Sequence, residues 1–355
     1  MSEGDARPAE GVTPAASVVI ATFNRADSVV RLLRALDVQT LPAPSFEVIV
    51  VDDESTVAVA PVVERAGLAR SPLVIRQPNG GPAAARDTGI RRATGRVIIV
   101  LDDDMIVAPE FLAEHMAMHA DTTRRVVLGR LRVPEGHRLQ LFERMQLALL
   151  DRLFDEVAAG RQRPAGKDVY TGNVSFLRAD YLAVGGFDRS LRLSEDAELG
   201  LRLERAGAQV VLSERAAALH ASDHASLSAW MRRSVAYGAA DAAIARMHGV
   251  TSATDVWRYL FLVHPVSRLF LLASAMAPSV MTPVARVAMW VAMAVGALGL
   301  ERVALAGATF AYGILYFAGV RRDAGSRGAC LRDLRSYVQS TEQGTFARLL
   351  RGFGV

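Results

Sequence analysis

Short apolar runs that end in polar residues recur along the first half of the chain. Four of them lack the two-residue alternation of a half-exposed strand and are rich in β-branched residues: 17–22, 46–51, 74–76 and 98–101. Such runs are typical of strands buried on both faces, as in parallel sheets. Helical spacing of apolar residues from Val29 to Leu36, and small residues over 83–93, predict helices between the strands. The alternation predicts an α/β fold with a mostly parallel sheet and right-handed crossovers.

The same kind of pattern continues beyond residue 136. Residues 137–160 show helical periodicity, 171–177 and 209–213 are expected to be strands, and 185–188 are expected to form a turn. Ser194 comes directly before Glu195 and Asp196, and a serine followed by acidic residues is typical of a helix start. We therefore expect a helix from Glu195 with Ser194 as its N-cap.

The chain becomes much more apolar after Ser226. Two long apolar runs, 287–300 and 303–320, are separated only by Glu301 and Arg302, and arginines flank the pair on both sides. Basic flanks favour a helical hairpin whose two ends face the cytoplasm. The first run is shorter than the roughly 20 residues that a spanning helix needs, and the second is close to that length. A spanning hairpin, an interfacial or re-entrant hairpin and a buried hairpin of a soluble protein therefore all fit.

The length of 355 residues allows two domains, or one domain with an appendage. Residues 1–16 are acidic and rich in Pro, Gly and Ala, and they contain no apolar segment of the kind found in signal peptides. We therefore expect a disordered leader, and a main domain over 17–240 that faces the cytoplasm. A hydrophobic helical region is expected over 241–322, with the hairpin at 287–320, and a basic tail suited to anionic lipid over 323–355.

Charge and cysteine content narrow the possibilities further. Basic and acidic residues number 41 and 37, which gives a net charge of +4, so we expect no nucleic-acid partner. The mean hydropathy of +0.21 is high for a soluble protein, and its source is the apolar region near the C-terminus. The single cysteine, Cys330, excludes an intrachain disulfide and a cysteine-rich zinc site.

Three consecutive carboxylates, Asp102, Asp103 and Asp104, follow the run at 98–101. Open α/β sheets bind ligands at the carboxyl ends of their strands. Neighbouring carboxylates repel one another unless a cation or a donor relieves them, and hard cations prefer oxygen ligands. Asp102 and Asp104 therefore suit Mg²⁺ or Mn²⁺ held against a diphosphate. The alternative is an acidic turn that caps a helix starting near Pro109.

Several further motifs occur together with these carboxylates. In chain order they are Val19-Ile20-Ala21-Thr22-Phe23-Asn24-Arg25, Val50-Val51-Asp52-Asp53-Glu54-Ser55, Asn79-Gly80-Gly81 with Ala85-Arg86-Asp87, Leu101-Asp102-Asp103-Asp104, Gly172-Asn173, Gly185-Gly186-Phe187-Asp188, and Glu195-Asp196 followed by Leu199 and Arg202-Leu203. The set, which covers residues 17–238, resembles a family 2 inverting glycosyltransferase of the GT-A fold. The resemblance implies a Rossmann-like, mostly parallel sheet flanked by helices, here with a C-terminal hydrophobic helical appendage.

The resemblance also implies a nucleotide-sugar donor and a divalent metal, Mn²⁺ or Mg²⁺, that neutralises charge on the leaving diphosphate. Asp104 is the expected metal ligand, with Asp102 reaching the metal or the ribose, and with His220 favoured over His224 as a further ligand. Asp53 is expected to bind the base, because the family places an acid there. The remaining residues expected to bind the donor are Thr22, Asn24, Arg25, Gly81, Arg86 and Asp103.

Inverting transfer requires a base that takes the proton of the acceptor hydroxyl, and by resemblance this base is Asp196. Glu195 is expected to orient the sugar or the base, and each carboxylate of such a pair raises the pKa of the other. The alternative is that both acids only stabilise the start of a helix. Gly172, Asn173 and Trp230 are expected to line the acceptor cleft. Asp87 departs from the pattern, since many relatives carry asparagine there.

Two other readings of the motifs remain open. A nucleotidyltransferase would carry a glycine-rich, basic signature after its first strand, where this chain has Ala21-Thr22-Phe23-Asn24-Arg25. A catalytically inactive, membrane-docked scaffold is disfavoured by the intact carboxylate pairs. We expect an inverting glycosyltransferase at the cytoplasmic face of the bacterial inner membrane. It would transfer sugar to a sugar or lipid-linked acceptor in the synthesis of cell-envelope polysaccharide, glycolipid or another glycoconjugate.

Overall fold

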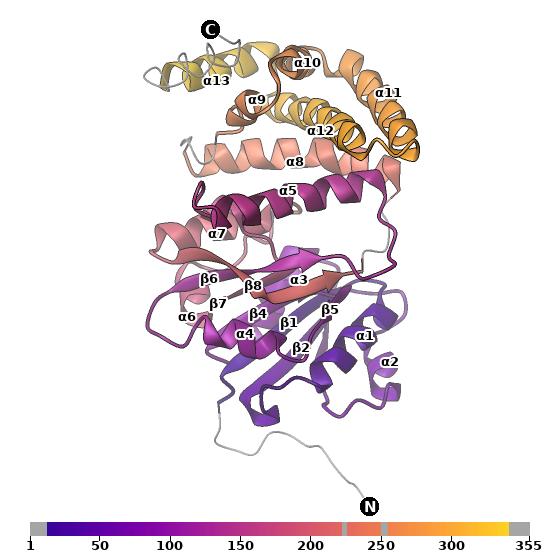
Figure 1. The fold of residues 1–355 in the computed structure, drawn as a ribbon. Helices are drawn as coiled ribbons and strands as arrows, with labels where there is room; N and C mark the ends of the chain where they lie inside the picture. The colour runs from indigo at the N-terminus through magenta and orange to yellow at the C-terminus, as the bar shows by residue number, and fades with distance from the viewer. Residues whose placement is uncertain (1–12, 222–225, 250–254, 341–355) are drawn as a thin grey trace, which may run out of the picture. The chain divides into compact units, whose positions relative to one another are not determined.

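The computed structural model describes residues 13–221, 226–249 and 255–340. The chain forms two compact units (Figure 1). The first unit consists of Met1–Arg138 and Leu149–Asp223, and the second of Leu139–Ala148 and His224–Val355. Helix α5 (Leu141–Ala158) is divided between the two units.

The first unit is built on one eight-stranded sheet with the order β3-β2-β1-β4-β7-β6-β8-β5. The neighbours β3, β2, β1 and β4 all run parallel, as do β6 and β8, whereas β7 is antiparallel to β4 and β6, and β5 is antiparallel to β8. The sheet is therefore mixed but mostly parallel, which confirms the predicted fold class. The strands are β1 (Ala16–Thr22), β2 (Phe46–Asp52), β3 (Leu73–Arg76), β4 (Val97–Asp102), β5 (Met105–Val107), β6 (Arg125–Arg132), β7 (Asn173–Leu177) and β8 (Gln209–His220).

Helices cover both faces of this sheet, and alternate residues of the inner strands supply the two cores. Val18 and Ile20 of β1 pack on one side, while Val19 packs on the other, because successive side chains of a strand point to opposite faces. The first core contains residues of α1 (Ala26–Asp37), α2 (Ala60–Arg65) and α4 (Phe111–Ala117). The second contains residues of α3 (Pro82–Arg92), α6 (Arg178–Ala183) and α7 (Glu195–Arg205). Short 3-10 turns lie at Ala43–Ser45 and Gly166–Asp168.

The second unit is helical and is organised around α12. Its helices are α8 (Leu227–Met247), α9 (Arg258–Leu262), α10 (Pro265–Met276), α11 (Pro278–Ala297), α12 (Glu301–Ala324) and α13 (Arg327–Ser340). Helices α8 and α12 pack backbone to backbone: a side chain at Gly238 would overlap the carbonyl of Tyr316, and one at Gly319 would overlap the carbonyl of Val235. Two small residues, one on each helix, therefore make this close approach possible.

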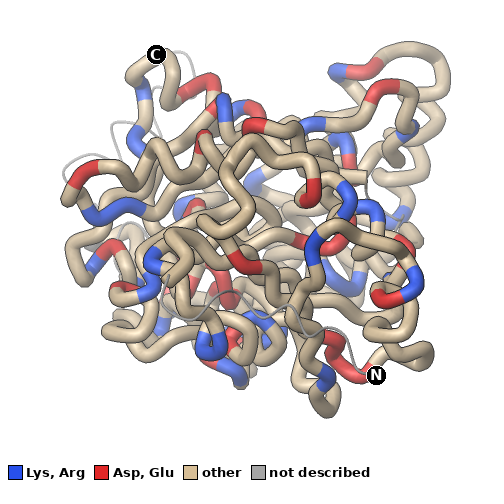
Figure 2. The backbone as a smooth tube through the Cα atoms, turned by 90° about the horizontal axis from the view of Figure 1, so that it is seen from below, with Lys and Arg blue, Asp and Glu red and all other residues tan. Residues whose placement is uncertain are grey.

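Charged residues of both signs are interspersed along the described backbone, as Figure 2 shows. Many of them pair locally. Arg130, for example, contacts Asp151 and Glu214 at 2.7 Å each. The nearly equal numbers of cations and anions thus allow many of them to pair locally.

The structure corrects several expected elements. Strands β5 and β6 and helices α6 and α8 were not predicted, and β8 runs on to His220, well past the expected end at 213. Ser194 does precede α7, but it has a φ of 58° and its side chain makes no capping bond. Helix α11 begins at Pro278 instead of 287, so it reaches 20 residues, because proline is well tolerated in the first turn of a helix.

A buried polar network ties α4 to the sheet. The two ring nitrogens of His115 lie 2.8 Å from the Ser175 hydroxyl and the Asn173 amide oxygen, and His119 reaches the same hydroxyl at 2.8 Å. Both histidines are almost fully buried. Burial lowers the pKa of His115 to about 4, and it does the same for the pKa of His119. Both rings are therefore neutral in the fold at physiological pH.

Acidification should destabilise the first unit through these two histidines. In the unfolded chain a histidine binds a proton near pH 6.5, whereas in the fold it stays neutral down to about pH 4. Below about pH 6.5 the free energy of unfolding should fall, by up to ~1.4 kcal/mol per pH unit for each histidine. Urea unfolding at a series of pH values measures this slope. A His115→Asn variant should show a shallower slope, and an unchanged slope would contradict this assignment.

Candidate active site

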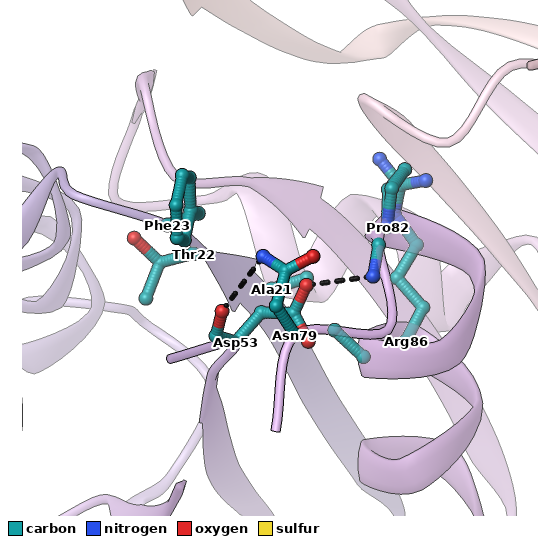
Figure 3. A pocket seen from close by; sticks show the side chains of 9 residues that line it. Ala21, Thr22, Phe23, Asp53, Asn79, Pro82 and Arg86 are labelled. Atoms are coloured by element: carbon teal, nitrogen blue, oxygen red, sulfur yellow. Dashed lines mark hydrogen bonds between the residues drawn. The ribbon is translucent and has the colours of Figure 1, made fainter. Parts of the chain in front are cut away.

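A pocket of about 220 Å³ lies at the carboxyl ends of β1 and β2, next to the start of α3 (Figure 3). Parallel neighbours bring the ends of their strands to one edge of the sheet, so residues distant in sequence meet there. Figure 3 shows Thr22 and Phe23 on one side of the pocket and Arg86, on α3, on the other. The lining residues are Ala21, Thr22, Phe23, Asp53, Asn79, Gly81, Pro82, Ala85 and Arg86.

Asp53, directly after β2, organises the glycine-rich loop. Its Oδ1 accepts hydrogen bonds from the Gln77 side chain at 2.8 Å and the Gly80 amide at 2.9 Å, and its Oδ2 accepts one from the Gly81 amide at 2.7 Å. Gly81 has a φ of 84°, a conformation that glycine adopts readily. The Asn79 side chain donates to the Asp53 carbonyl at 3.0 Å. The carboxylate is therefore held rigidly in the pocket wall.

Asp52, in contrast, serves the local backbone. Its carboxylate accepts hydrogen bonds from the amides of Ser55 at 2.8 Å and Val59 at 3.2 Å, and it pairs with Arg76 at 3.0 Å. Burial alone would raise the pKa of Asp52, but the bonds from Ser55 and Val59 and the charge of Arg76 lower it. Asp52 thus holds the local backbone, whereas its neighbour Asp53 lies in the wall of the pocket.

The residues after β1 close around the acidic turn. The Thr22 hydroxyl donates to Asp103 at 2.6 Å, and Arg25 contacts Asp103 at 3.2 Å and Asp104 at 2.7 Å. Asn24 has a φ of 59°, and its side-chain oxygen accepts the Thr56 amide at 2.7 Å. Three of the predicted donor residues are therefore brought together at the turn, while the Asn24 oxygen holds a neighbouring loop.

Asp103 and Asp104 are both 6% exposed. Burial raises the pKa of Asp103 to about 6, although Thr22 and Arg25 act in the opposite direction. For Asp104 burial also acts upward, but the imidazole of His220, followed by Arg25, brings its pKa below the usual value. The pKa of His220 is raised by Asp104, against the effect of burial.

The pairing of β5 with β8 brings His220 to this turn, since His220 lies opposite Met105 in the register. Its Nε2 is 3.4 Å from Asp104 Oδ1, which is longer than a normal hydrogen bond, and that oxygen is buried without a hydrogen-bond partner among the described residues. A buried carboxylate oxygen facing an imidazole nitrogen is suited to a divalent cation.

Asp102, the third expected metal ligand, pairs with Arg86. Over the described ranges 13–221, 226–249 and 255–340, no three His, Cys, Asp or Glu side chains are grouped so as to hold a metal ion. Asp102 contacts Arg86 at 2.7 Å, and a side chain at Gly172 would come within 3.2 Å of its carboxylate. Asp104 and His220 therefore fit a metal that takes its remaining oxygen ligands from a bound diphosphate.

Arg86 is the link between the acidic turn and α7. It is 7% exposed, and its two terminal nitrogens donate to Asp102 and Glu195 at 2.7 Å each. Burial alone would lower the pKa of Arg86, but the charges of Asp102 and Glu195 raise it. Asp196 follows Glu195, and burial, then the charge of Glu195, raise the pKa of Asp196 to about 7. A carboxylate of this kind takes up a proton near neutral pH.

The remaining predicted residues lie in different settings. Gly172 borders Asp102, whereas the Asn173 side chain is fully buried between His115 and the Ala216 carbonyl. Trp230 belongs to the core of the second unit, where it is 3% exposed and stacks on Phe142 at 5.6 Å. His224 lies outside the described residues.

Phe23 and Arg192 were not predicted as site residues. Phe23 lines the pocket and is 50% exposed, and its position as an aromatic residue just after a buried strand is a signal that the sequence offered. Arg192 lies in the loop before α7, and its guanidinium occupies the space that a side chain on Gly81 would take. Nothing in the sequence marked Arg192.

The surroundings of Asp87 explain why this chain has an aspartate where many relatives have an asparagine. It is 1% exposed and accepts hydrogen bonds from the Tyr181 hydroxyl at 2.6 Å, Arg91 at 2.9 Å and Arg189 at 2.6 Å. A side chain at Gly186 would come within 2.7 Å of the Asp87 carboxylate. Two arginines provide the charge that an ionised Asp87 needs, and the cluster fixes the loop that leads to α7.

Comparisons with known proteins agree with this geometry. The sequence model described as "Glycosyl transferase family 2" matches residues 17–183. Validoxylamine A glucosyltransferase of Streptomyces hygroscopicus is 32% identical over 56% of this chain and 54% of its own length. Pre-mycofactocin glycosyltransferase of Mycobacterium tuberculosis is 30% identical over 65% of this chain and 48% of its own length. The chain thus spans about half the length of these curated relatives.

Solved structures show the same fold. The mannosyltransferase PcManGT from Pyrobaculum calidifontis, in complex with GDP-Man and Mn²⁺, matches with a TM-score of 0.58 and 20% identity over 87% of this chain and 90% of its own. S. aureus TarS in complex with UDP-GlcNAc matches with a TM-score of 0.50 and 18% identity, over 72% of each chain. The domain at residues 17–183 belongs to glycosyl transferase family 2 and has the GT-A fold, which confirms the resemblance of its motifs.

Proposed function

We propose that this glycosyltransferase moves a sugar from a nucleoside-diphosphate donor to an acceptor hydroxyl with inversion at the anomeric carbon. The observation that carries the proposal is the contact of one buried arginine, Arg86, with both Asp102 and Glu195. It links the acidic turn at the pocket to the acids of α7. The complexes of relatives with GDP-Man and with UDP-GlcNAc support a nucleotide-sugar donor.

Asp196 acts in this proposal as the general base. Its carboxylate takes the proton of the acceptor hydroxyl while that oxygen bonds to the anomeric carbon, and the bond from that carbon to the phosphate oxygen breaks. The nucleoside diphosphate leaves with the electron pair. Glu195 holds Arg86, whose charge lies close to the leaving group and favours its departure.

Asp104 and His220 would hold a divalent cation, Mn²⁺ or Mg²⁺. Such a cation would neutralise charge on the leaving diphosphate. Phe23 offers an exposed ring face on which a nucleobase can stack, and Asp53 offers a fixed acceptor for an N–H on the base. Thr22 and Arg25 hold the acidic turn in place.

Exchange of Asp196 for asparagine should lower kcat by about 10²- to 10⁴-fold, because the base is lost. In the wild type, kcat/KM should rise with pH up to about 7, since the pKa of Asp196 lies there and only the carboxylate can accept a proton. A pH profile of sugar transfer measures both effects. The exposed residue Asp121 provides a control, Asp121→Asn, that should leave the rate unchanged. Full activity in Asp196→Asn would rule out this base.

An Asp104→Ala variant tests the metal site. In the wild type, UDP, GDP or dTDP with Mn²⁺ should raise the unfolding temperature, and saturation at 100 times Kd stabilises by about 2.7 kcal/mol. Asp104→Ala should lose the part of this rise that depends on Mn²⁺, whereas Asp121→Asn should keep it. A rise that survives in Asp104→Ala would contradict the metal assignment. A wild type that responds to no nucleotide would favour a scaffold.

The second unit is proposed to attach the enzyme to a membrane. Helices α11 and α12 are long and apolar enough to span a membrane, as the core helices of some soluble proteins also are. In the most apolar stretch of each helix, 22% of α11 and 56% of α12 is buried. Large apolar residues of α11 and its C-cap are more than half exposed: Val280, Val287, Trp290, Val291 and Leu298. All of them except Trp290 follow one another at steps of seven, four and seven. Such spacing forms one face of a helix. An apolar face on α11 would hold the enzyme at the cytoplasmic face of a bacterial inner membrane. There it would meet a lipid-linked acceptor, such as a polyprenyl-linked glycan.

Charges on this face should release the protein from lipid. The double variant Val287→Glu and Val291→Glu should bind vesicles that contain anionic lipid about tenfold or more weakly, since a carboxylate is costly in hydrocarbon. Val38, which is 62% exposed in the first unit, supplies the matched control Val38→Glu. Co-sedimentation measures binding, and equal binding of all three proteins would exclude α11 as the attachment.

A further inference from the structure

The Asp53 carboxylate has one acceptor position left. A carboxylate offers about four such positions, and three are used, two on Oδ1 and one on Oδ2. The free position is on Oδ2, the oxygen that binds the Gly81 amide. Because Asp53 and Gly81 both line the pocket, a ligand's N–H can reach this position.

Arg192 supplies a donor at the same glycine. Its guanidinium lies against Gly81 so closely that no side chain would fit there. The two arginines described above at the site are both engaged with acids, Arg25 with the acidic turn and Arg86 with Asp102 and Glu195. Within the described part of the chain, Arg192 has neither a hydrogen bond nor an ion pair, and the residue is exposed. Its N–H groups are therefore available to a ligand.

We infer that Arg192 reads the edge of the nucleobase beside Asp53, whose own contact with the base is part of the proposed function. The inference rests on the proposed donor binding and names the class of donor. A free carboxylate position beside a free guanidinium is complementary to a ring N–H next to a carbonyl oxygen. Uracil, thymine and guanine carry that edge. Cytosine and adenine instead present an unprotonated ring nitrogen next to an amino group, which would place acceptor against acceptor and donor against donor.

The site is therefore built for uridine, thymidine or guanosine diphosphate donors, and Arg192 contributes to that preference by matching the carbonyl oxygen of the base. Gly81 contributes to the same recognition of the base. Its missing side chain lets the guanidinium lie over the backbone, and its amide orients the Asp53 oxygen. Phe23, on the opposite side of the pocket from Arg86, offers a face to any base and so does not discriminate among them.

Calorimetric titration of the full-length protein with UDP, dTDP, GDP, CDP and ADP, each with Mn²⁺, tests the inference. The wild type should bind at least one of the first three much more tightly than CDP and ADP. Arg192→Met should weaken the preferred nucleotide by about 10- to 100-fold, as expected for the loss of a charge-assisted hydrogen bond, and should leave CDP and ADP nearly unchanged. The affinity of Arg192→Lys should lie between those of the wild type and Arg192→Met, because lysine keeps a charged donor and loses the planar array of N–H groups of the guanidinium.

The matched control is Arg92→Met, which removes an exposed arginine from the last turn of α3 and should change no affinity. An equal loss for all five nucleotides in Arg192→Met would overturn the inference and place the guanidinium on the diphosphate. Unchanged binding in that variant, or a wild-type preference for CDP or ADP, would overturn it too, while sugar transfer would still stand. A wild type that binds none of the five would overturn the proposed function as well.

Discussion

The contact of Arg86 with Asp102 and Glu195 is the constraint on which the site depends. Burial of the Arg86 guanidinium against the Glu195 carboxylate is favourable only as long as both are present, because both charges have left water, whereas Asp102 keeps part of its exposure. Removal of one partner of such a buried pair costs about 3–5 kcal/mol. Since Asp102 ends β4 and Glu195 begins α7, this one arginine joins two elements that are distant in the sequence.

Around this contact the acids of the site carry different charges for physical reasons. Asp104 is kept ionised by His220 and Arg25, whereas burial brings the pKa of Asp103 to about 6 and, together with Glu195, that of Asp196 to about 7. Carboxylates that look equivalent in the sequence therefore differ in proton affinity. The environment of each one, and not its residue type, suits it to bind a cation or to accept a proton.

Much of the first unit was predictable because its central strands are buried on both faces. Strands β1, β2 and β4 each contain a continuous run of buried apolar residues, and the polar residues at their ends mark the ligand-binding edge. Strand β6 was missed because Gly129 and Arg130 interrupt its apolar run, and β5 because it has only three residues. The sequence spacing of Asp102 and Asp104 did not reveal that they pair with different arginines, Asp102 with Arg86 and Asp104 with Arg25.

The short pairing of β5 with β8 has a consequence for how the site is assembled. Only three residue pairs hold it, from Met105 with His220 to Val107 with Ala218, and they join segments far apart in the chain. A slip of one residue would turn His220 to the other face of the sheet. Contacts between distant segments also carry the largest loop-closure cost and tend to form late in folding. The lining of the pocket comes from the first quarter of the chain, so we expect it to form before the imidazole reaches Asp104. Most of the place for the base would then exist in a nascent chain before the place for the cation.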